Sequence, residues 1–84
     1  MNTSTKKMVK KLVEDWLESP DEGYFVYHGM IEACLMDLNP VTEAYGFFKA
    51  VEAELRVAMK ETPTGLKSYN DFITALQDHK EVWL

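Results

Sequence analysis

The sequence predicts an all-α fold, a small up-and-down helical bundle of about four helices. Three observations predict it. Apolar residues recur at helical spacing in four segments, proline or glycine stands at the breaks between most of these segments, and each break is short. A chain of 84 residues has room for one small core. We therefore expect a single helical domain over residues 1–84, with residues 1–4 disordered.

The first helix is expected to run from Thr3 or Ser4, either of which can cap it, to about Ser19. Its apolar and charged residues fall on opposite faces, as in an ordinary amphipathic surface helix. Its largest apolar side chain, Trp16, is the expected anchor in the core. The apolar face comprises Met8, Val9, Leu12, Val13 and Trp16.

A second helix is predicted to begin at Ser19-Pro20-Asp21-Glu22, which combines a capping serine, a proline at the first helical position and a glutamate placed to close a capping box. The aromatic and β-branched run over residues 24–27 would suit a strand equally well. Because no partner strand is evident, a helix is preferred.

This second helix carries more apolar surface than one helical face can hold. One stripe comprises Tyr24, Tyr27, His28, Ile31, Cys34, Leu35 and Leu38, and a second stripe behind it comprises Phe25, Gly29, Ala33 and Met36. The surplus indicates either a central helix covered on both sides or a surface for another protein, and the sequence leaves both open.

The third helix is predicted to begin at Asn39-Pro40, where asparagine can cap and proline suits the first turn. Its expected core stripe has close to ideal helical spacing, with Phe47 at its edge. That stripe comprises Val41, Ala44, Tyr45, Phe48, Val51, Leu55, Ala58 and Met59. On the back lies a strip of small side chains that would let another helix approach closely: Gly46, Ala50, Ala53 and Val57.

The last helix is expected after the break at residues 62–65, with Ser68 and Asp71 forming its opening signal. Because chain ends fray unless they are docked, Trp83 near the end is expected to pack against something. The predicted inner face comprises Tyr69, Phe72, Ile73, Leu76 and Trp83. Among all these apolar residues, substitutions of Trp16, Phe48 and Leu55 are expected to be the most damaging.

Charge and composition narrow the classes of partner. The chain has 14 acidic and 9 basic residues and a formal charge of −5, so direct binding to nucleic acid is not expected and a basic protein surface is the favoured partner. A helix-turn-helix reading of the second and third helices fails because the would-be recognition helix has too few early basic residues. The single cysteine, Cys34, fits a reducing cytoplasm, and no apolar run is long enough to span a membrane.

No catalytic, cofactor-binding or metal-binding motif is evident, so an enzyme is not expected. His28 and Glu32 lie one helical turn apart, but a metal site needs more ligands than these and His79 supply. We expect the His28 ring at the margin of the apolar stripe with one nitrogen hydrogen-bonded, and His79 at the core edge. Glu52 falls near the apolar face of the third helix, where Arg56 is the expected neutralising partner.

The leading functional hypothesis is a small acidic cytoplasmic interaction module, an adaptor or inhibitor of a larger protein such as one that processes nucleic acid. Phages and other mobile elements often encode inhibitors of this composition, an association that suggests such a source. The expected contact residues are Phe25, Met30, Met36, Gly46, Ala50, Ala53 and Val57, with Glu14, Asp15 and Glu18 docking on a basic surface. The alternatives are a homo-oligomeric assembly protein, such as a homodimer, and a small-ligand-binding or enzymatic helical domain.

Overall fold

Four α-helices make up the fold in the computed structural model, which describes residues 3–19, 21–61 and 66–84. They are α1 (Thr3–Glu18), α2 (Tyr24–Met36), α3 (Pro40–Glu61) and α4 (Leu66–Trp83). No strand occurs among the described residues, so the predicted all-α bundle is confirmed, as is a helix over residues 24–27. The described part of the N-terminus, from Thr3 onward, is already helical.

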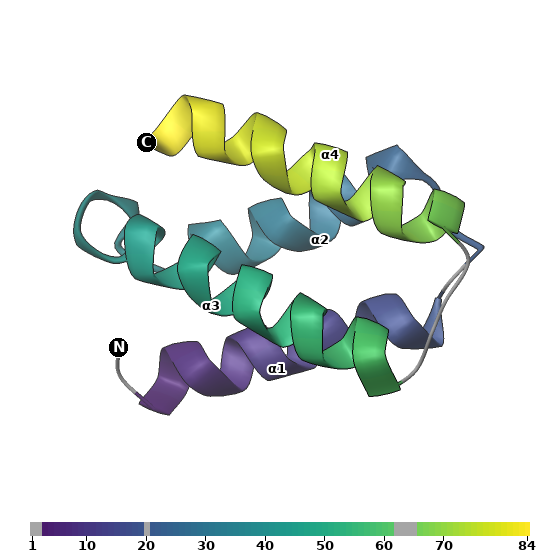
Figure 1. The fold of residues 1–84 in the computed structure, drawn as a ribbon. Helices are drawn as coiled ribbons and strands as arrows, with labels where there is room; N and C mark the ends of the chain where they lie inside the picture. Colours follow the sequence, from purple (N-terminus) through teal and green to yellow (C-terminus); the bar gives the residue numbers. More distant parts are fainter. Residues whose placement is uncertain (1–2, 20, 62–65) are drawn as a thin grey trace.

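Successive helices reverse direction, so α1 and α3 run one way while α2 and α4 run the other (Figure 1). The most extensive packing is between helices that run in the same direction, α1 against α3 and α2 against α4. The carboxyl ends of α2 and α4 therefore lie at the same end of the bundle (Figure 1). This arrangement decides where the groove described below is found.

The core is built around five large aromatic side chains contributed by all four helices: Trp16, Tyr27, Phe47, Phe48 and Phe72. Aliphatic residues of α1, α2, α3 and α4 fill the space around these rings. Each fully buried side chain of this size stabilises the fold by roughly 1.5 to 3 kcal/mol relative to an exposed one. The predicted anchors Trp16, Phe48 and Leu55 are all buried.

The predicted start of α2 at Ser19 is wrong, because the helix begins four residues after the proline, at Tyr24. Its N-cap is Gly23, which has an extended backbone and makes no side-chain capping hydrogen bond. Ser19 belongs to the end of α1 instead, where its N–H donates to the carbonyl of Trp16. Its carbonyl then accepts from the N–H of Glu22 and the hydroxyl of Tyr27, which leaves this residue in a turn. Pro20 lies outside the described residues.

In α3 the predicted start at Asn39-Pro40 is confirmed and the predicted core face is partly wrong. The Asn39 carbonyl accepts from the N–H groups of Thr42 and Glu43, and the Glu43 carboxylate accepts from the Asn39 N–H at 3.0 Å. Tyr45 is 63% exposed, Val41 is 89% exposed, and Phe47 is fully buried rather than at the edge. Glu54 and Ala58 lie on the same flank of α3 as Phe47 and line the groove against α1, so the buried arc is rotated toward α1.

In α4 the predicted inner face is right except at its carboxyl end, and Tyr69 and Ile73 are half-buried and pack against the core. Phe72 and Leu76 are buried, but Trp83 is 44% exposed. Ser68 is not a cap, since α4 begins at Leu66 and the Ser68 side chain is buried in the core. Ala75, which was not in the predicted face, is also buried, as is His79, which was expected at the core edge. The predicted break at residues 62–65 lies outside the described residues.

Candidate functional site

Helix α2 has no polar face. Among its 13 residues Glu32 is the single aspartate, glutamate, lysine or arginine. Its inner face, formed by Tyr27, Ile31 and Leu35, is buried in the core. Its opposite face is exposed and includes Glu32. We call the apolar residues of this face the outer face of α2: Phe25, Val26, Gly29, Ala33 and Met36.

The two large ends of this outer face are almost fully open to solvent. Phe25 is 86% exposed and Met36 is 79% exposed. A helix that is apolar on all sides is normally covered on all sides. The second apolar stripe predicted from the sequence is thus left uncovered by the rest of the described chain.

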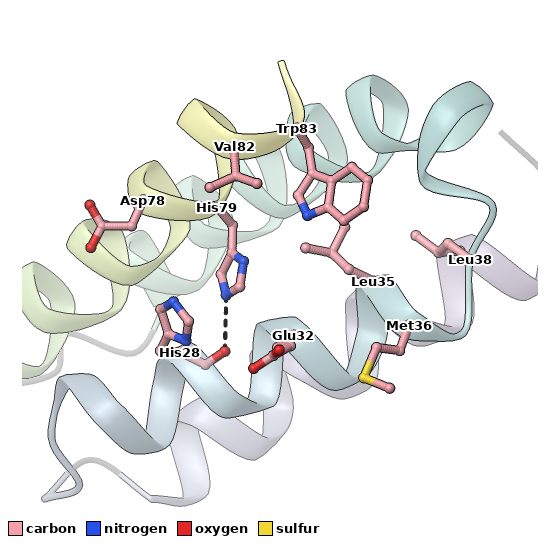
Figure 2. Close-up of a pocket in the computed structure, with 9 residues that line it drawn as sticks. All are labelled: His28, Glu32, Leu35, Met36, Leu38, Asp78, His79, Val82 and Trp83. Atoms are coloured by element: carbon pink, nitrogen blue, oxygen red, sulfur yellow. Dashed lines mark hydrogen bonds between the residues drawn. The ribbon is translucent and has the colours of Figure 1, made fainter.

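A groove with a volume of about 470 Å³ separates α2 from α4 near their carboxyl ends. We call it the α2/α4 groove. Figure 2 shows Trp83 directed toward Leu35 at one end of it and two imidazoles side by side farther along. Its lining residues are His28, Glu32, Leu35, Met36, Leu38, Asp78, His79, Val82 and Trp83. Met36 belongs both to this groove and to the outer face of α2.

The two imidazoles form a stacked pair across the helix interface. The ring centroids of His28 and His79 are 4.0 Å apart, with the ring planes tilted by 32°. The buried His79 ring donates from Nε2 to the backbone carbonyl of His28 at 3.1 Å (Figure 2). The hydrogen-bonded imidazole is therefore that of His79, whereas the sequence had indicated His28.

A second polar contact ties the same helices together near the amino end of α2. The hydroxyl of Tyr24 donates a short hydrogen bond to the carboxylate of Asp78. This bond, with a smaller effect from burial, raises the pKa of Tyr24 above its ordinary value of 10.0. The phenol therefore keeps its proton at neutral pH and holds the Asp78 side chain.

A smaller groove of about 300 Å³ lies on the other side of α2, against α1. It contains Met30 and the half-buried Cys34, with Asp15 and Asp37 at its rim. Burial, then the nearby negative charges of Asp37 and Asp15, raise the pKa of the Cys34 thiol to about 11. The thiol is thus protonated, and unreactive as a nucleophile, at neutral pH.

Two of the three acidic residues singled out in α1 line different grooves. Glu14 lines a groove between α1 and α3, whereas Asp15 lines the groove between α1 and α2. Asp15 also accepts from Lys11 at 3.4 Å, while Glu18 is exposed. Because Glu18 lies one helical turn from both of them, a joint contact of the three residues with a partner stays a prediction.

The strip of small residues on α3 is only partly free. Ala50 packs against the core, and Gly46 is half-buried. Ala53 is exposed, and Val57, which is half-exposed, lines the groove between α1 and α3. Because α1 covers part of this side, the strip offers another helix less room than its spacing suggested.

Glu52 is neutralised across the helix interface rather than along its own helix. Its Oε1 accepts from Lys80 Nζ of α4 at 2.5 Å, and both side chains are about three-quarters buried. The predicted pairing with Arg56 is therefore wrong. The physical reason is that α4 brings Lys80 onto the rim, whereas Arg56 is exposed.

Sequence reasoning did not predict the α2/α4 groove, because it depends on which helices pair. The apolar end of the chain, with Val82 and Trp83, was the available signal. Within the described residues no group of three or more histidine, cysteine, aspartate or glutamate side chains is arranged to hold a metal ion. In the same residues, no helix is both long and apolar enough to cross a membrane.

Comparison of the chain with protein-family models, with characterised proteins and with solved structures finds no match. Function must therefore be argued from the outer face of α2 and the grooves beside it.

Proposed function

We propose that this chain is a protein–protein interaction module, an adaptor or inhibitor that binds a larger protein through the outer face of α2. The observation that carries the proposal is the exposure of Phe25 and Met36 on a helix with a single charged residue. Large exposed apolar side chains grouped on one face are a common mark of protein interaction sites. The proposed activity is binding, without a chemical step.

Several features extend the same apolar surface sideways from α2. Met30 lies in the groove against α1, and Met36 lies at the edge of the groove against α4. Methionine side chains are flexible and polarizable, so they adapt well to a partner surface. A partner that covers the outer face of α2 would meet both of them.

The charge of the chain favours a basic partner. A net charge of −5 on 84 residues attracts a basic surface and repels a second copy. Proteins that process nucleic acid carry such basic surfaces, so they are the partner class we favour. The acidic residues Glu14 and Glu18, both exposed, would contribute to the rate of association rather than to a defined contact.

A photo-crosslinking side chain at position 25 tests this proposal in the cells that make the protein. Benzoylphenylalanine in place of Phe25 should form an adduct with one larger protein. The matched control carries the same group in place of Gln77, an exposed polar position on α4, and should form no such adduct. Adducts of twice the chain mass would instead favour the homo-oligomeric assembly protein. Absence of any adduct at position 25 would contradict both.

A further inference from the structure

The α2/α4 groove combines an apolar wall with negative charge. Leu35, Leu38, Val82 and Trp83 supply the apolar part. The lining also includes two carboxylates, Glu32 and Asp78, and contains no lysine or arginine.

The ends of two helices add to this negative potential. Helix α2 ends at Met36 and α4 ends at Trp83, and both residues line the groove. The carboxyl end of a helix carries a partial negative charge, which favours a cation nearby. Lys80, in the last turn of α4, is paired with Glu52 on the side facing α3, so its charge does not offset the groove.

The two carboxylates differ in their availability. Asp78 accepts the hydrogen bond of Tyr24. Glu32 is exposed, and no hydrogen bond or ion pair joins it to another described residue. A carboxylate beside an apolar wall suits arginine, whose guanidinium donates two parallel hydrogen bonds and whose stem and flat face pack on apolar and aromatic surface.

The floor of the groove is already fixed before any partner binds. The His79 ring is buried, and its Nε2–H bonds to the backbone of His28. The ring of His28 stacks on it at 4.0 Å. A surface that does not need to be ordered on binding loses less conformational entropy, which favours affinity.

We infer that the α2/α4 groove binds an amphipathic helix of the partner in which a large apolar residue and an arginine lie one turn apart. The apolar side chain packs against Leu38 and Trp83, and the guanidinium pairs with Glu32. An apolar groove between two helices is a common receptor for a helix of this kind. The inference rests on the proposed function and adds to it the chemistry of the partner. A second copy of this chain is disfavoured by its charge of −5.

The test is an NMR titration of the full chain, labelled with nitrogen-15, with two synthetic helical peptides. One presents leucine and arginine on the same face, and the other is identical except that glutamine replaces every arginine. The arginine peptide should bind saturably and shift the amides of Glu32 and Leu38 and the indole N–H of Trp83. The glutamine peptide should bind about tenfold more weakly, as expected for loss of one charge-assisted hydrogen bond.

Two variants with the same net charge distinguish a direct contact of Glu32 with the peptide from a general effect of net charge. Glu32→Gln and Glu22→Gln each remove one exposed carboxylate and change the net charge equally. Glu32→Gln should weaken binding of the arginine peptide about tenfold, and Glu22→Gln should change its affinity less than twofold. The amide spectra of both variants report directly whether the fold is retained.

The inference is overturned if the two peptides bind equally, if neither binds, if Glu32→Gln binds the arginine peptide no more weakly than Glu22→Gln, or if the shifts fall outside the groove. If the titration fails but position 25 forms a specific crosslink, the inference about the groove is wrong and the proposed function still stands. If the groove binds the arginine peptide but position 25 forms no crosslink, the groove stands as a binding site and the proposed function of the outer face of α2 fails.

Discussion

The indole of Trp16 donates a hydrogen bond of 2.9 Å to the hydroxyl of Ser68, although 52 residues separate them in the sequence. Ser68 in turn lies 3.1 Å from the hydroxyl of Tyr27, which donates to the carbonyl of Ser19 at 2.7 Å. Because Tyr27 donates its single hydroxyl proton to the Ser19 carbonyl, the hydroxyl of Ser68 must be the donor to the Tyr27 oxygen. One chain of donors and acceptors therefore joins α1, α4, α2 and the turn after α1.

Removal of the Ser68 hydroxyl should break this chain at its centre. Ser68→Ala leaves the buried indole N–H of Trp16 without an acceptor, which costs about 1 to 3 kcal/mol of unfolding free energy. Thr74→Ala, at an exposed position of the same helix, controls for helix propensity and should change stability by less than about 0.5 kcal/mol. Urea denaturation followed by circular dichroism measures both, and equal stabilities would contradict the role assigned to Ser68.

The ion pair between Glu52 and Lys80 should contribute measurably because it is mostly shielded from water. Lys80→Met is expected to lower the unfolding free energy by about 1 kcal/mol, while Arg56→Met should have almost no effect. A double-mutant cycle with Glu52→Gln assigns the coupling to one pair. Coupling of Glu52 with Arg56 instead of Lys80 would show that the pair forms along α3.

The sequence was sufficient to predict the helices and most of the core because both depend on local periodicity. The stripe through Phe48, Val51 and Leu55 has helical spacing whatever the rest of the chain does, and all three are buried. Errors arose where a residue serves the tertiary structure. Ser19 and Ser68 both match capping signals, but their polar groups serve the chain of hydrogen bonds through Tyr27.

The site was harder to predict because it depends on helix pairing. That α2 carries a second apolar stripe followed from its composition, and its exposure could be learned only from coordinates. Nothing in the spacing of residues brings His28 against His79 or Trp83 toward Leu35, since those contacts follow from α2 and α4 packing in parallel. The same is true of Glu52, for which the sequence suggested the neighbour one turn away.

Cys34 should titrate far above neutrality. With a pKa raised from 9.0 to about 11, its thiolate fraction near pH 8 should be roughly 100-fold lower than that of an ordinary cysteine. Alkylation by iodoacetamide should therefore be slow in the folded chain and fast in urea. Asp37→Asn, which removes one of the charges that raise the pKa, should accelerate the reaction of the folded chain.

The same shift makes folding stability depend on alkaline pH. The folded chain holds the Cys34 proton up to about pH 11, whereas the unfolded chain releases it near 9.0. Because the folded state binds more protons in this window, stability is fully present below pH 9 and falls as pH rises toward 11. The raised pKa of Tyr24 acts in the same direction, so the Cys34→Ala variant isolates the cysteine part. If the unfolding free energy of the parent chain and of Cys34→Ala changed equally with pH between 9 and 11, the raised pKa of Cys34 would be refuted.

Phe47 and Tyr45 offer a direct test of how α3 is rotated in the bundle. Phe47→Ala should cost about 3 to 5 kcal/mol, as much as Phe48→Ala, because both rings are buried and stack edge to face. Tyr45→Ala should cost less than about 1 kcal/mol, since its ring is 63% exposed and the Lys49 ammonium lies 5.6 Å from the ring centroid. If Tyr45→Ala cost more than Phe47→Ala, the core face predicted from the sequence spacing would be correct instead.

Gly29 lies at the centre of the outer face of α2. Apart from its chain neighbours and the local backbone of its own helix, no heavy atom of the described residues comes within 4 Å of an added Cβ. Glycine inside a helix costs about 1 kcal/mol relative to alanine, so Gly29→Ala should raise the unfolding free energy by about that amount. Gly46→Ala on α3, equally unobstructed, should have a similar effect. Both variants are compared with the parent chain across protein concentrations. If Gly29→Ala alone becomes destabilising at high protein concentration, a second copy of the chain packs closely on this face. That result would contradict the proposal that a different protein binds there.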